Sequence, residues 1–271
     1  MSTHALALEM MAARASRQPT TTPPSARDEA FDLDAAYAVE AALVRLRTTD
    51  GRTTVGRKVG FANKAMWRVL KLDSLVWAHM YDDTVRFADG NASSLSLAAM
   101  CSPKIEPEIV FKLKAPIEPG PLEPAAVLES VEWLALGFEI IDCVFPGWKF
   151  QPVDFVASFG LHAGLVVGEP LRVEADKIPQ LVEQLPRFTV KLLNNGDLVG
   201  EGSGRNSLRS PALCIGELGA AILRRSPEEP LAAGELISSG TLTESQPITP
   251  GETWTAVVEG LDLPALTLTT T

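Results

Sequence analysis

The sequence has little of what marks several large classes of protein. Its three cysteines, Cys101, Cys143 and Cys214, are far apart and form no CxxC pair, which argues against a disulfide framework or a cysteine zinc site. No apolar run approaches the roughly 18 residues that a membrane helix needs, and no basic segment followed by an apolar core opens the chain. We therefore expect a soluble, cytoplasmic protein with reduced thiols.

Positive charge is also in short supply. Lysine and arginine number 24 against 34 acidic residues, which gives a net charge of -10 and a pI near 4.9. This balance argues against nucleic acid and anionic membranes as partners. Hydrophobic residues make up 46% of the 271 positions, which is enough for a substantial folded core.

Histidine is scarce, and this restricts the possible chemistry. Only His4, His79 and His162 are present, and His4 belongs to the N-terminal segment. A Ser-His-Asp triad would have to use His79 or His162, and no G-x-S-x-G motif supports one. His162 is either a packed polar residue or a general acid-base.

Two glutamates one residue apart are the most informative feature that is present. Glu106 and Glu108 lie in Lys104-Ile-Glu-Pro-Glu-Ile-Val-Phe111, which has the composition of a short strand. Side chains two apart on a strand share a face, so the carboxylates would repel unless a proton or a cation lies between them. The alternative is a solvated edge strand, which Pro107 favours.

A third carboxylate favours the cation. Glu139 lies in a second apolar run, Leu134–Val144, and shares its expected face with small or apolar residues, so its charge needs a partner. Asp142 is three positions further on and would face the opposite side. Glu106, Glu108 and Glu139 together would form an all-oxygen site that suits Mg²⁺ or Mn²⁺ better than zinc.

The chain divides into a short helical segment and a longer mixed region. Helices are predicted over residues 4–16 and 32–47, with a proline-rich linker at 18–25 between them. Beyond Val55, short strands alternate with turns, and helices are expected near 62–70, 125–131, 177–184 and 210–224. This pattern predicts an α+β fold with a mostly antiparallel, curled sheet. We expect an arm and linker at 1–31 and a single catalytic domain at 32–271.

Three further segments carry polar groups. Lys58 stands between glycines in Val55–Phe61, where it is either an exposed turn residue or a partner for a carboxylate or phosphate. The glycine-rich stretch 196–205 follows a strand and an Asn-Asn-Gly turn, which predicts a β-hairpin and not a nucleotide loop. Ser239, Gly240 and Thr241 leave a strand in a tight loop and are candidate substrate-binding residues.

In this order, the segments resemble the fumarylacetoacetate hydrolase superfamily, and specifically its branch of 2-oxopent-4-enoate hydratases and 4-oxalocrotonate decarboxylases of aromatic meta-cleavage pathways. The resemblance runs from about Asp32 to the C-terminus. The segments that carry it are Gly56-Arg-Lys-Val-Gly60, Pro103-Lys-Ile-Glu-Pro-Glu-Ile109, Phe138-Glu-Ile-Ile-Asp142, Ser239-Gly-Thr241 and Pro250-Gly251.

The resemblance implies a mixed β-sheet roll with flanking helices. It also implies a Mg²⁺ or Mn²⁺ ion on Glu106, Glu108 and Glu139, with Lys58 as an active-site lysine. The expected activity is that of a metal-dependent lyase on a small unsaturated 2-oxo acid, similar to 2-hydroxypenta-2,4-dienoate hydratase. Members commonly form homo-oligomers and some associate with a pathway partner enzyme.

Two departures from the branch leave alternatives open. Val76 stands where the hydratases tend to carry an aspartate, which favours a 4-oxalocrotonate-type decarboxylase. A usually polar segment is here Val156-Ala-Ser-Phe-Gly-Leu-His162, which favours a bulkier or less charged substrate. His162 or His79 is the candidate for a second proton transfer. C–C bond hydrolysis of a 1,3-dicarbonyl and a non-catalytic partner subunit are the remaining alternatives.

Overall fold

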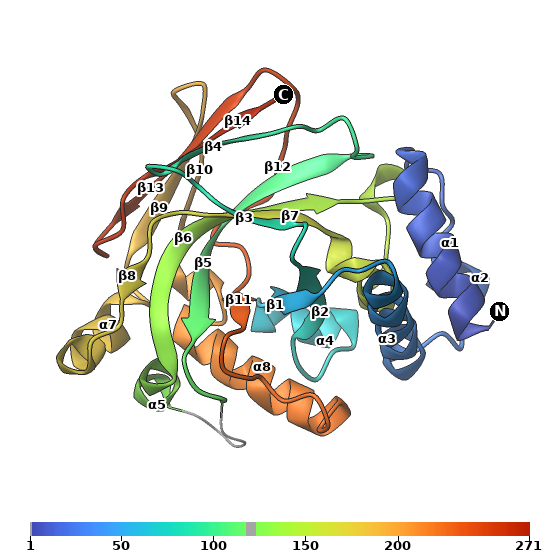
Figure 1. Cartoon of the computed structure of the whole chain (residues 1–271), viewed down its shortest axis with the longest axis horizontal. Coiled ribbons are helices and arrows are strands. Elements are labelled where there is room, and N and C mark those ends of the chain that lie inside the picture. The colour runs from blue at the N-terminus through green and yellow to red at the C-terminus, as the bar shows by residue number, and fades with distance from the viewer. Residues whose placement is uncertain (1, 118–122) are drawn as a thin grey trace.

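The computed structural model describes residues 2–117 and 123–271, and in these residues two β-sheets are flanked by helices (Figure 1). The helices are α1 (Thr3–Ser16), α2 (Pro24–Arg27), α3 (Leu33–Thr49), α4 (Lys64–Leu70), α5 (Pro124–Glu129), α6 (Pro152–Ala157), α7 (Ile178–Gln184) and α8 (Pro211–Arg225). The short 3₁₀ turns are η1 (Pro146–Trp148), η2 (Phe159–Leu161), η3 (Ala175–Lys177) and η4 (Gly204–Asn206).

The larger sheet has the order β2-β1-β11-β5-β6-β7-β3, with β12 added beside β5 and β8 beside β6. Its strands are β1 (Thr54–Gly60), β2 (Val76–Tyr81), β3 (Val85–Phe87), β5 (Pro103–Leu113), β6 (Val131–Asp142), β7 (His162–Val167), β8 (Leu171–Arg172), β11 (Leu236–Ser238) and β12 (Gln246–Pro247). The pairs β1–β11 and β3–β7 are parallel and the others are antiparallel. The predicted mixed α+β sheet is confirmed.

The smaller sheet has the order β10-β9-β13-β14-β4 and lies across the upper left of Figure 1. Its strands are β4 (Ala92–Leu95), β9 (Thr189–Asn194), β10 (Asp197–Ser203), β13 (Thr253–Glu259) and β14 (Leu266–Thr270). Strands β9 and β10 form the predicted hairpin. Asn195 and Gly196 both have positive φ, of 51° and 91°, as a tight two-residue hairpin turn requires.

Strand β5 is central in the larger sheet and is not the edge strand that Pro107 favours. It pairs with β6 along its length on one side, and with β11 and then β12 on the other. The carbonyl of Pro107 accepts a hydrogen bond from Leu242 N at 2.9 Å, so the proline nitrogen faces the break between β11 and β12. Proline is tolerated here because no regular ladder bond is lost.

The N-terminal arm packs against the rest of the chain. Helix α1 lies beside α3 at the right of Figure 1, and its side chains Leu6 and Met10 are buried in the main hydrophobic core. The linker is tied down as well, because Thr21 N donates to the carbonyl of Val144 at 3.1 Å. Ser25 donates to the carboxylate of Asp154 from both its amide and its hydroxyl, at 2.8 and 2.6 Å.

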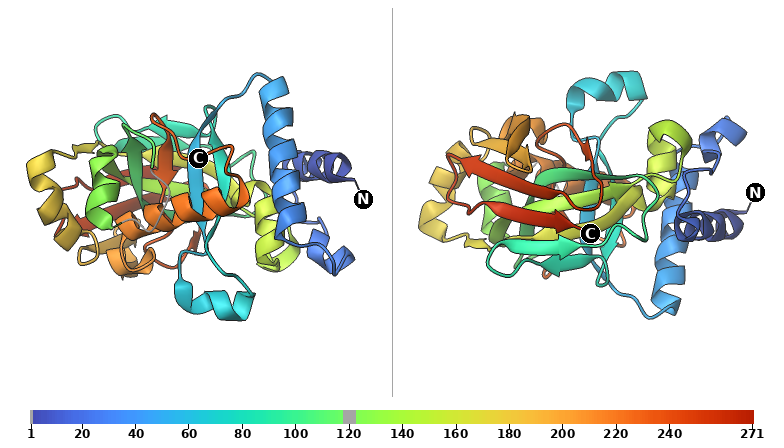
Figure 2. Two further views of the ribbon diagram at one scale, coloured as in Figure 1. Left: turned by 90° about the horizontal axis from the view of Figure 1, so that it is seen from below. Right: turned by 90° about the horizontal axis from the view of Figure 1, so that it is seen from above.

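The predicted helices agree with the structure to within about two residues at most ends. Helix α4 begins two residues later than predicted, at Lys64, because Asn63 caps it by accepting a hydrogen bond from Ala65 N. Figure 2 shows α4, in cyan, projecting from the body of the molecule. The sequence did not predict α2 or α6. In the described part of the chain, no helix combines the length and the apolar character that crossing a membrane requires.

Replacing Met10 with alanine tests the contribution of the arm. Met10 is fully buried between α1 and the core, so the variant should lose about 2–5 kcal/mol of unfolding free energy in chemical denaturation. Leu8→Ala is the matched control on the same helix, because Leu8 is 47% exposed and should change the stability by less than about 0.5 kcal/mol. Equal stability of the two variants would show that α1 contributes nothing to the core.

Candidate metal centre and active site

Neighbouring strands bring the three glutamates together. The β5–β6 register places Glu106 directly opposite Glu139, and Glu108 lies two residues along β5 on the same face. One carboxylate oxygen from each residue lies within 4.8 Å of the others. Glu108 and Glu139 are fully buried and Glu106 is half-buried. The predicted juxtaposition of these three side chains is therefore present in the structure.

Glu108 is held by the segment that follows β11. Its Oε2 atom accepts hydrogen bonds from the Ser238 hydroxyl at 2.5 Å and from Gly240 N at 2.8 Å. Gly240 has φ of +93°, and a Cβ atom there would lie 2.8 Å from Ala62, so glycine is required. Among the described residues, the buried Oε1 atom of Glu108 has no hydrogen-bond partner. Such an orphaned acceptor is costly unless a ligand binds it.

Glu139 is held by a lysine on one oxygen and a histidine on the other. Lys58 Nζ lies 3.0 Å from Oε2, and His162 Nδ1 lies 2.9 Å from Oε1. His162 Nε2 is 2.9 Å from the Thr84 hydroxyl. Burial lowers the pKa of His162 although Glu139 opposes it. The lowered pKa favours the neutral ring, with Nδ1–H donating to Glu139. The Thr84 hydroxyl also lies 2.9 Å from the carbonyl of Tyr81, so its single hydrogen is donated either to that carbonyl or to Nε2.

Burial and neighbouring charges shift the pKa values of the three glutamates and of Lys58. Burial, reinforced by the neighbouring carboxylates, raises the pKa of Glu108 well above its usual range, and burial raises that of Glu106 to about 7. Burial disfavours the charged forms of Glu139 and Lys58 as well. Their mutual attraction overcomes it, so the pKa of Glu139 is lowered and that of Lys58 is raised. Lys58 is therefore protonated at neutral pH.

The donor set fits a divalent cation. The raised pKa values of Glu106 and Glu108 show that the ionised carboxylates lack a compensating charge. With all three ionised, as metal binding requires, they and the protonated lysine carry a net charge of −2, which a divalent ion would neutralise. The ligands are all oxygen atoms, the preference of Mg²⁺, Mn²⁺ and Ca²⁺, and the orphaned oxygen of Glu108 lies within the cluster. The charge of the site, its oxygen ligands and the unpartnered oxygen of Glu108 therefore all fit a bound divalent cation.

A pocket of about 290 Å³ adjoins this cluster. Lys58 and Glu106 line it together with Gly240 and Thr241. The rest of the lining is largely apolar or aromatic, with a few neutral polar groups: Val59, Gly60, Phe61, Ala62, Asn63, Ile141, Trp148, Phe150, Phe155, Leu161, Asn206 and Ser245. The site therefore combines two charged side chains with a largely apolar lining, as ligand pockets commonly do.

The structure places the other predicted site residues in different surroundings. Gly240 and Thr241 line the pocket, but the hydroxyl of Ser239 is buried and donates to the carbonyl of Ile109 at 2.8 Å. His162 lies behind Glu139, 2% exposed, and is not among the residues that line the pocket. Asp142 faces away from the cluster, as expected, and accepts hydrogen bonds from the amides of Cys101 and Ser102.

His79 is not brought to the carboxylate cluster. It pairs with Arg57 in the β1–β2 ladder, and Arg57 and Lys58 are adjacent on β1, so their side chains face opposite sides of the sheet. His79 Nδ1 instead lies 2.7 Å from Glu40 on α3, while Arg57 forms an ion pair with Glu235. This second buried group of charges lies on the other side of β1.

The sequence analysis missed the aromatic lining residues Trp148, Phe150 and Phe155. Two of them lie in Phe145-Pro-Gly-Trp-Lys-Phe150, which directly follows β6. A high density of aromatic residues in a turn that also contains proline and glycine is the signal that could have identified them, because loops carry binding residues disproportionately often.

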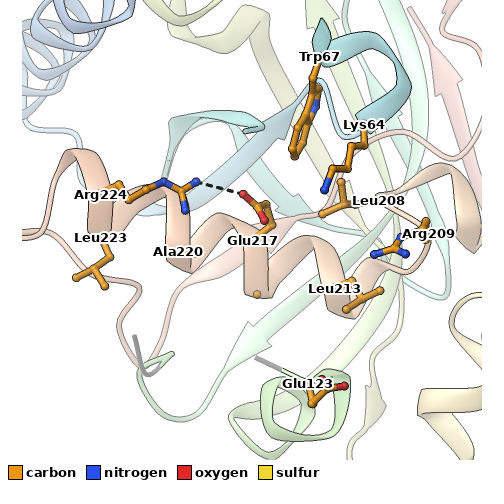
Figure 3. A pocket seen from close by; sticks show the side chains of 11 residues that line it. Lys64, Trp67, Glu123, Leu208, Arg209, Leu213, Glu217, Ala220, Leu223 and Arg224 are labelled. Atoms are coloured by element: carbon orange, nitrogen blue, oxygen red, sulfur yellow. Dashed lines mark hydrogen bonds and ion pairs between the residues drawn. The ribbon is translucent and has the colours of Figure 1, made fainter. Parts of the chain in front are cut away.

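A second, larger hollow of about 480 Å³ lies between α4 and α8 and contains no part of this cluster. Figure 3 shows Lys64 and Trp67 pointing from α4 toward α8, where Glu217 and Arg224 form an ion pair at 3.2 Å. The described residues that line it do not include Lys58 or any of the three glutamates. Size alone therefore does not identify the active site.

Comparison with known proteins finds sequence relatives that are hydratases and decarboxylases. No family model matches the chain. It is 27% identical over 242 residues to a 2-hydroxyhexa-2,4-dienoate hydratase from Comamonas testosteroni, covering 89% of this chain and 88% of the relative. It is 29% identical over 230 residues to a 4-oxalocrotonate decarboxylase from a Pseudomonas species, covering 85% and 84%.

Solved structures show the same fold. The 4-oxalocrotonate decarboxylase from Pseudomonas putida G7, complexed with magnesium and adipate, has a TM-score of 0.88 at 21% identity and covers 99% of this chain and 97% of its own. A fumarylpyruvate hydrolase from Pseudomonas aeruginosa, in complex with Mn²⁺ and pyruvate, has a TM-score of 0.56 at 15% identity over 80% and 88%.

The fold is thus that of fumarylacetoacetate hydrolase-like proteins. Within that class, the sequence is similar to 2-keto-4-pentenoate hydratases and 4-oxalocrotonate decarboxylases, and the resemblance predicted from the sequence is confirmed.

Replacing Ser238 with alanine tests how the carboxylate cluster is built. The variant removes one of the two donors that orient Glu108, so Mn²⁺ affinity measured by calorimetry should fall about 10- to 100-fold. Ser207→Ala is the control, because its buried hydroxyl donates only to the carbonyl of Ser239, at 2.6 Å. Unchanged affinity in Ser238→Ala would show that Glu108 does not bind the metal.

Proposed function

We propose that this protein is a divalent-metal-dependent lyase that acts on an unsaturated 2-oxo acid and resembles 2-hydroxypenta-2,4-dienoate hydratase. The observation that carries the proposal is the cluster of three carboxylates and a protonated lysine adjoining a largely apolar pocket. The similarity to hydratases and decarboxylases over 85–89% of the chain supports it. Homo-oligomeric assembly and a cytoplasmic location stay predictions.

Glu106, Glu108 and Glu139 would hold the cation, with Mg²⁺ or Mn²⁺ as the proposed ion. When bound, it would supply Lewis-acid stabilisation of the negative charge that develops on the keto oxygen of the substrate. His162 and Ser238 fix the orientation of Glu139 and Glu108 and have no direct part in the chemistry. Because His162 and Ser238 are buried, they hold the two carboxylates in one geometry, and these side chains need not reorganise when the substrate binds.

Lys58 is the residue of this chain placed to act on the substrate directly. Its ammonium lines the pocket and contacts Glu139 and the carbonyl of Gly160, both at 3.0 Å. As a protonated group it can pair with the substrate carboxylate and can donate a proton to the carbon skeleton as the double bond shifts. The apolar lining around it excludes bulk water and strengthens both interactions.

A 4-oxalocrotonate-type decarboxylase is the second candidate. The observation that favours it is Val76, which is buried on β2 and pairs with Gly60, a residue that lines the pocket. Val76 occupies the position where the hydratases of the resembled branch tend to carry an aspartate, and valine has no ionisable group to act as a general acid-base. Loss of CO₂ generates the same enolate without addition of water, so the charged groups of the pocket suit either reaction.

The deciding experiment follows the ultraviolet absorbance of 2-hydroxypenta-2,4-dienoate with the full-length protein. Chelator-stripped protein should be inactive, and Mg²⁺ or Mn²⁺ should restore the loss of absorbance because the carboxylates alone cannot stabilise an enolate. A parallel assay of CO₂ release from 4-oxalocrotonate tests the second candidate. Failure of both reactions with metal present would leave C–C bond hydrolysis of a 1,3-dicarbonyl and the non-catalytic subunit as the alternatives.

Replacing Glu106 with glutamine should abolish turnover and leave the fold intact. The substitution removes a charged ligand, so metal affinity should fall by more than the roughly 10- to 100-fold cost of losing an outer hydrogen-bond partner. Calorimetry with Mn²⁺ and circular dichroism would measure the two effects. Glu132→Gln, at the far end of β6, is the matched control, and full activity in Glu106→Gln would show that the site is elsewhere.

A further inference from the structure

Four aromatic side chains that line the active-site pocket form a connected series of rings, called here the aromatic wall: Phe61, Trp148, Phe150 and Phe155. Phe155 is the ring next to the charged groups, because Lys58 Nζ lies 4.8 Å from its centroid, and the wall continues from it through Phe150 to Trp148. The Phe61 and Phe155 rings meet edge to face with centroids 5.2 Å apart. Phe150 lies 6.5 Å from Phe155 and 6.3 Å from Trp148. These spacings are typical of packed aromatic pairs, so the wall is an ordered surface.

The backbone is strained where it presents this wall. Phe61 and Trp148 both have φ of 58°, and the neighbouring lining residue Leu161 has φ of 56°. Bulky residues rarely adopt this conformation, and such outliers gather at ligand sites. Two of the four aromatic residues are also held by hydrogen bonds: the Trp67 indole donates to the carbonyl of Phe61 at 2.7 Å, and the Trp148 indole donates to the Ser102 hydroxyl at 2.9 Å.

Among the described residues, the aromatic wall contains no cationic side chain that could pair with a second carboxylate of the substrate. Of the described residues that line the pocket, Lys58 is the only cation, and it is paired with Glu139. Lys104 Nζ lies over the Trp148 ring, 4.2 Å from its centroid, but Lys104 does not line the pocket. A buried carboxylate without a cation partner is strongly disfavoured, whereas an alkyl chain or aryl ring on this wall is favoured.

We propose that the aromatic wall binds the distal end of the substrate, and that this end is a bulky apolar substituent. The substrate class is then a 2-hydroxydienoate, or its 2-oxo tautomer, that has one carboxylate and carries an alkyl chain or an aryl ring on its distal carbon. The inference rests on the proposed lyase function and extends it by naming the substituent. Trp148 and Phe150 are the residues that determine specificity.

A substrate series tests the proposal with the metal-loaded protein. The members are 2-hydroxydienoates whose distal carbon carries hydrogen, methyl, propyl, phenyl or carboxylate. The value of kcat/KM should rise about fourfold for each buried methylene, should be highest for propyl or phenyl, and should be at least tenfold lower for carboxylate than for methyl. A series without preference, or a preference for carboxylate, would overturn the proposal while leaving the lyase function standing.

Variants of the wall link the preference to these residues. Trp148→Ala and Phe150→Ala should each lower the phenyl-to-hydrogen ratio of kcat/KM at least tenfold. Phe150→Leu should retain most of the preference. Phe87→Ala is the matched control, because Phe87 is 58% exposed on β3 and is not part of the wall. An unchanged ratio in both alanine variants would overturn the assignment.

A binding measurement separates failure of this inference from failure of the proposed function. Saturated 2-oxo acids, which a hydratase cannot convert, serve as probes in calorimetry: 2-oxopentanoate, 4-phenyl-2-oxobutanoate and 2-oxoadipate. The phenyl compound should bind at least tenfold more tightly than 2-oxopentanoate, and 2-oxoadipate more weakly. Tighter binding of 2-oxoadipate that is lost in Lys104→Met would overturn the inference, because Lys104 would then bind the distal carboxylate. This result is independent of turnover.

Discussion

The repulsion among three carboxylates in a buried site is the constraint on which the rest of the active site depends. Oxygen atoms of Glu106, Glu108 and Glu139 lie within 4.8 Å of one another, and burial removes the water that would screen them. Each neighbouring polar group reduces this repulsion. Lys58 supplies a positive charge, Ser238 and Gly240 donate to Glu108, and the neutral ring of His162 donates to Glu139. When all three carboxylates are ionised, a charge of −2 remains, which a divalent ion would match.

The order of strands places these groups in register. Strands β1, β11, β5, β6 and β7 are consecutive neighbours in the larger sheet, so lysine, serine, the glutamates and histidine come from five strands that are distant in sequence. Successive side chains of β1 face opposite sides of the sheet, so Lys58 lies on one face with Glu139. Arg57 lies on the other face, where its ladder partner His79 contacts Glu40. A one-residue slip of β1 would exchange the faces of Lys58 and Arg57, which the buried charges strongly disfavour.

The sequence predicted the parts of the site that follow from local spacing. The two-residue period of a strand was sufficient to place Glu106 and Glu108 on one face, and the apolar neighbours of Glu139 indicated a buried partner for it. The roles of Ser239 and His79 were not predictable, because each depends on which strand lies alongside: Ser239 turns toward Ile109, and His79 toward Glu40. The aromatic wall was also missed. Positive φ at Phe61 and Trp148 cannot be predicted from those residue types, and the density of aromatic residues around Trp148 was the signal that could have been used. Helix α6 begins at a proline and spans only Pro152–Ala157, too short for a helical period to be recognised.

Pro107 has a consequence for the chain segment that passes beside the pocket. A sheet normally gains stability when every backbone N–H and C=O group forms an inter-strand hydrogen bond. Strands β11 and β12 pair with the same side of β5, with a short gap between them. Because proline has no N–H, a regular strand placed across that gap would lose one of its bonds. The intervening chain still donates from Ser239 N to Ile109 and from Leu242 N to Pro107. Between these two bonds, Gly240 donates to Glu108 and Thr241 lines the pocket. The position without a donor in the central strand thus lies opposite the segment that meets the ligand site.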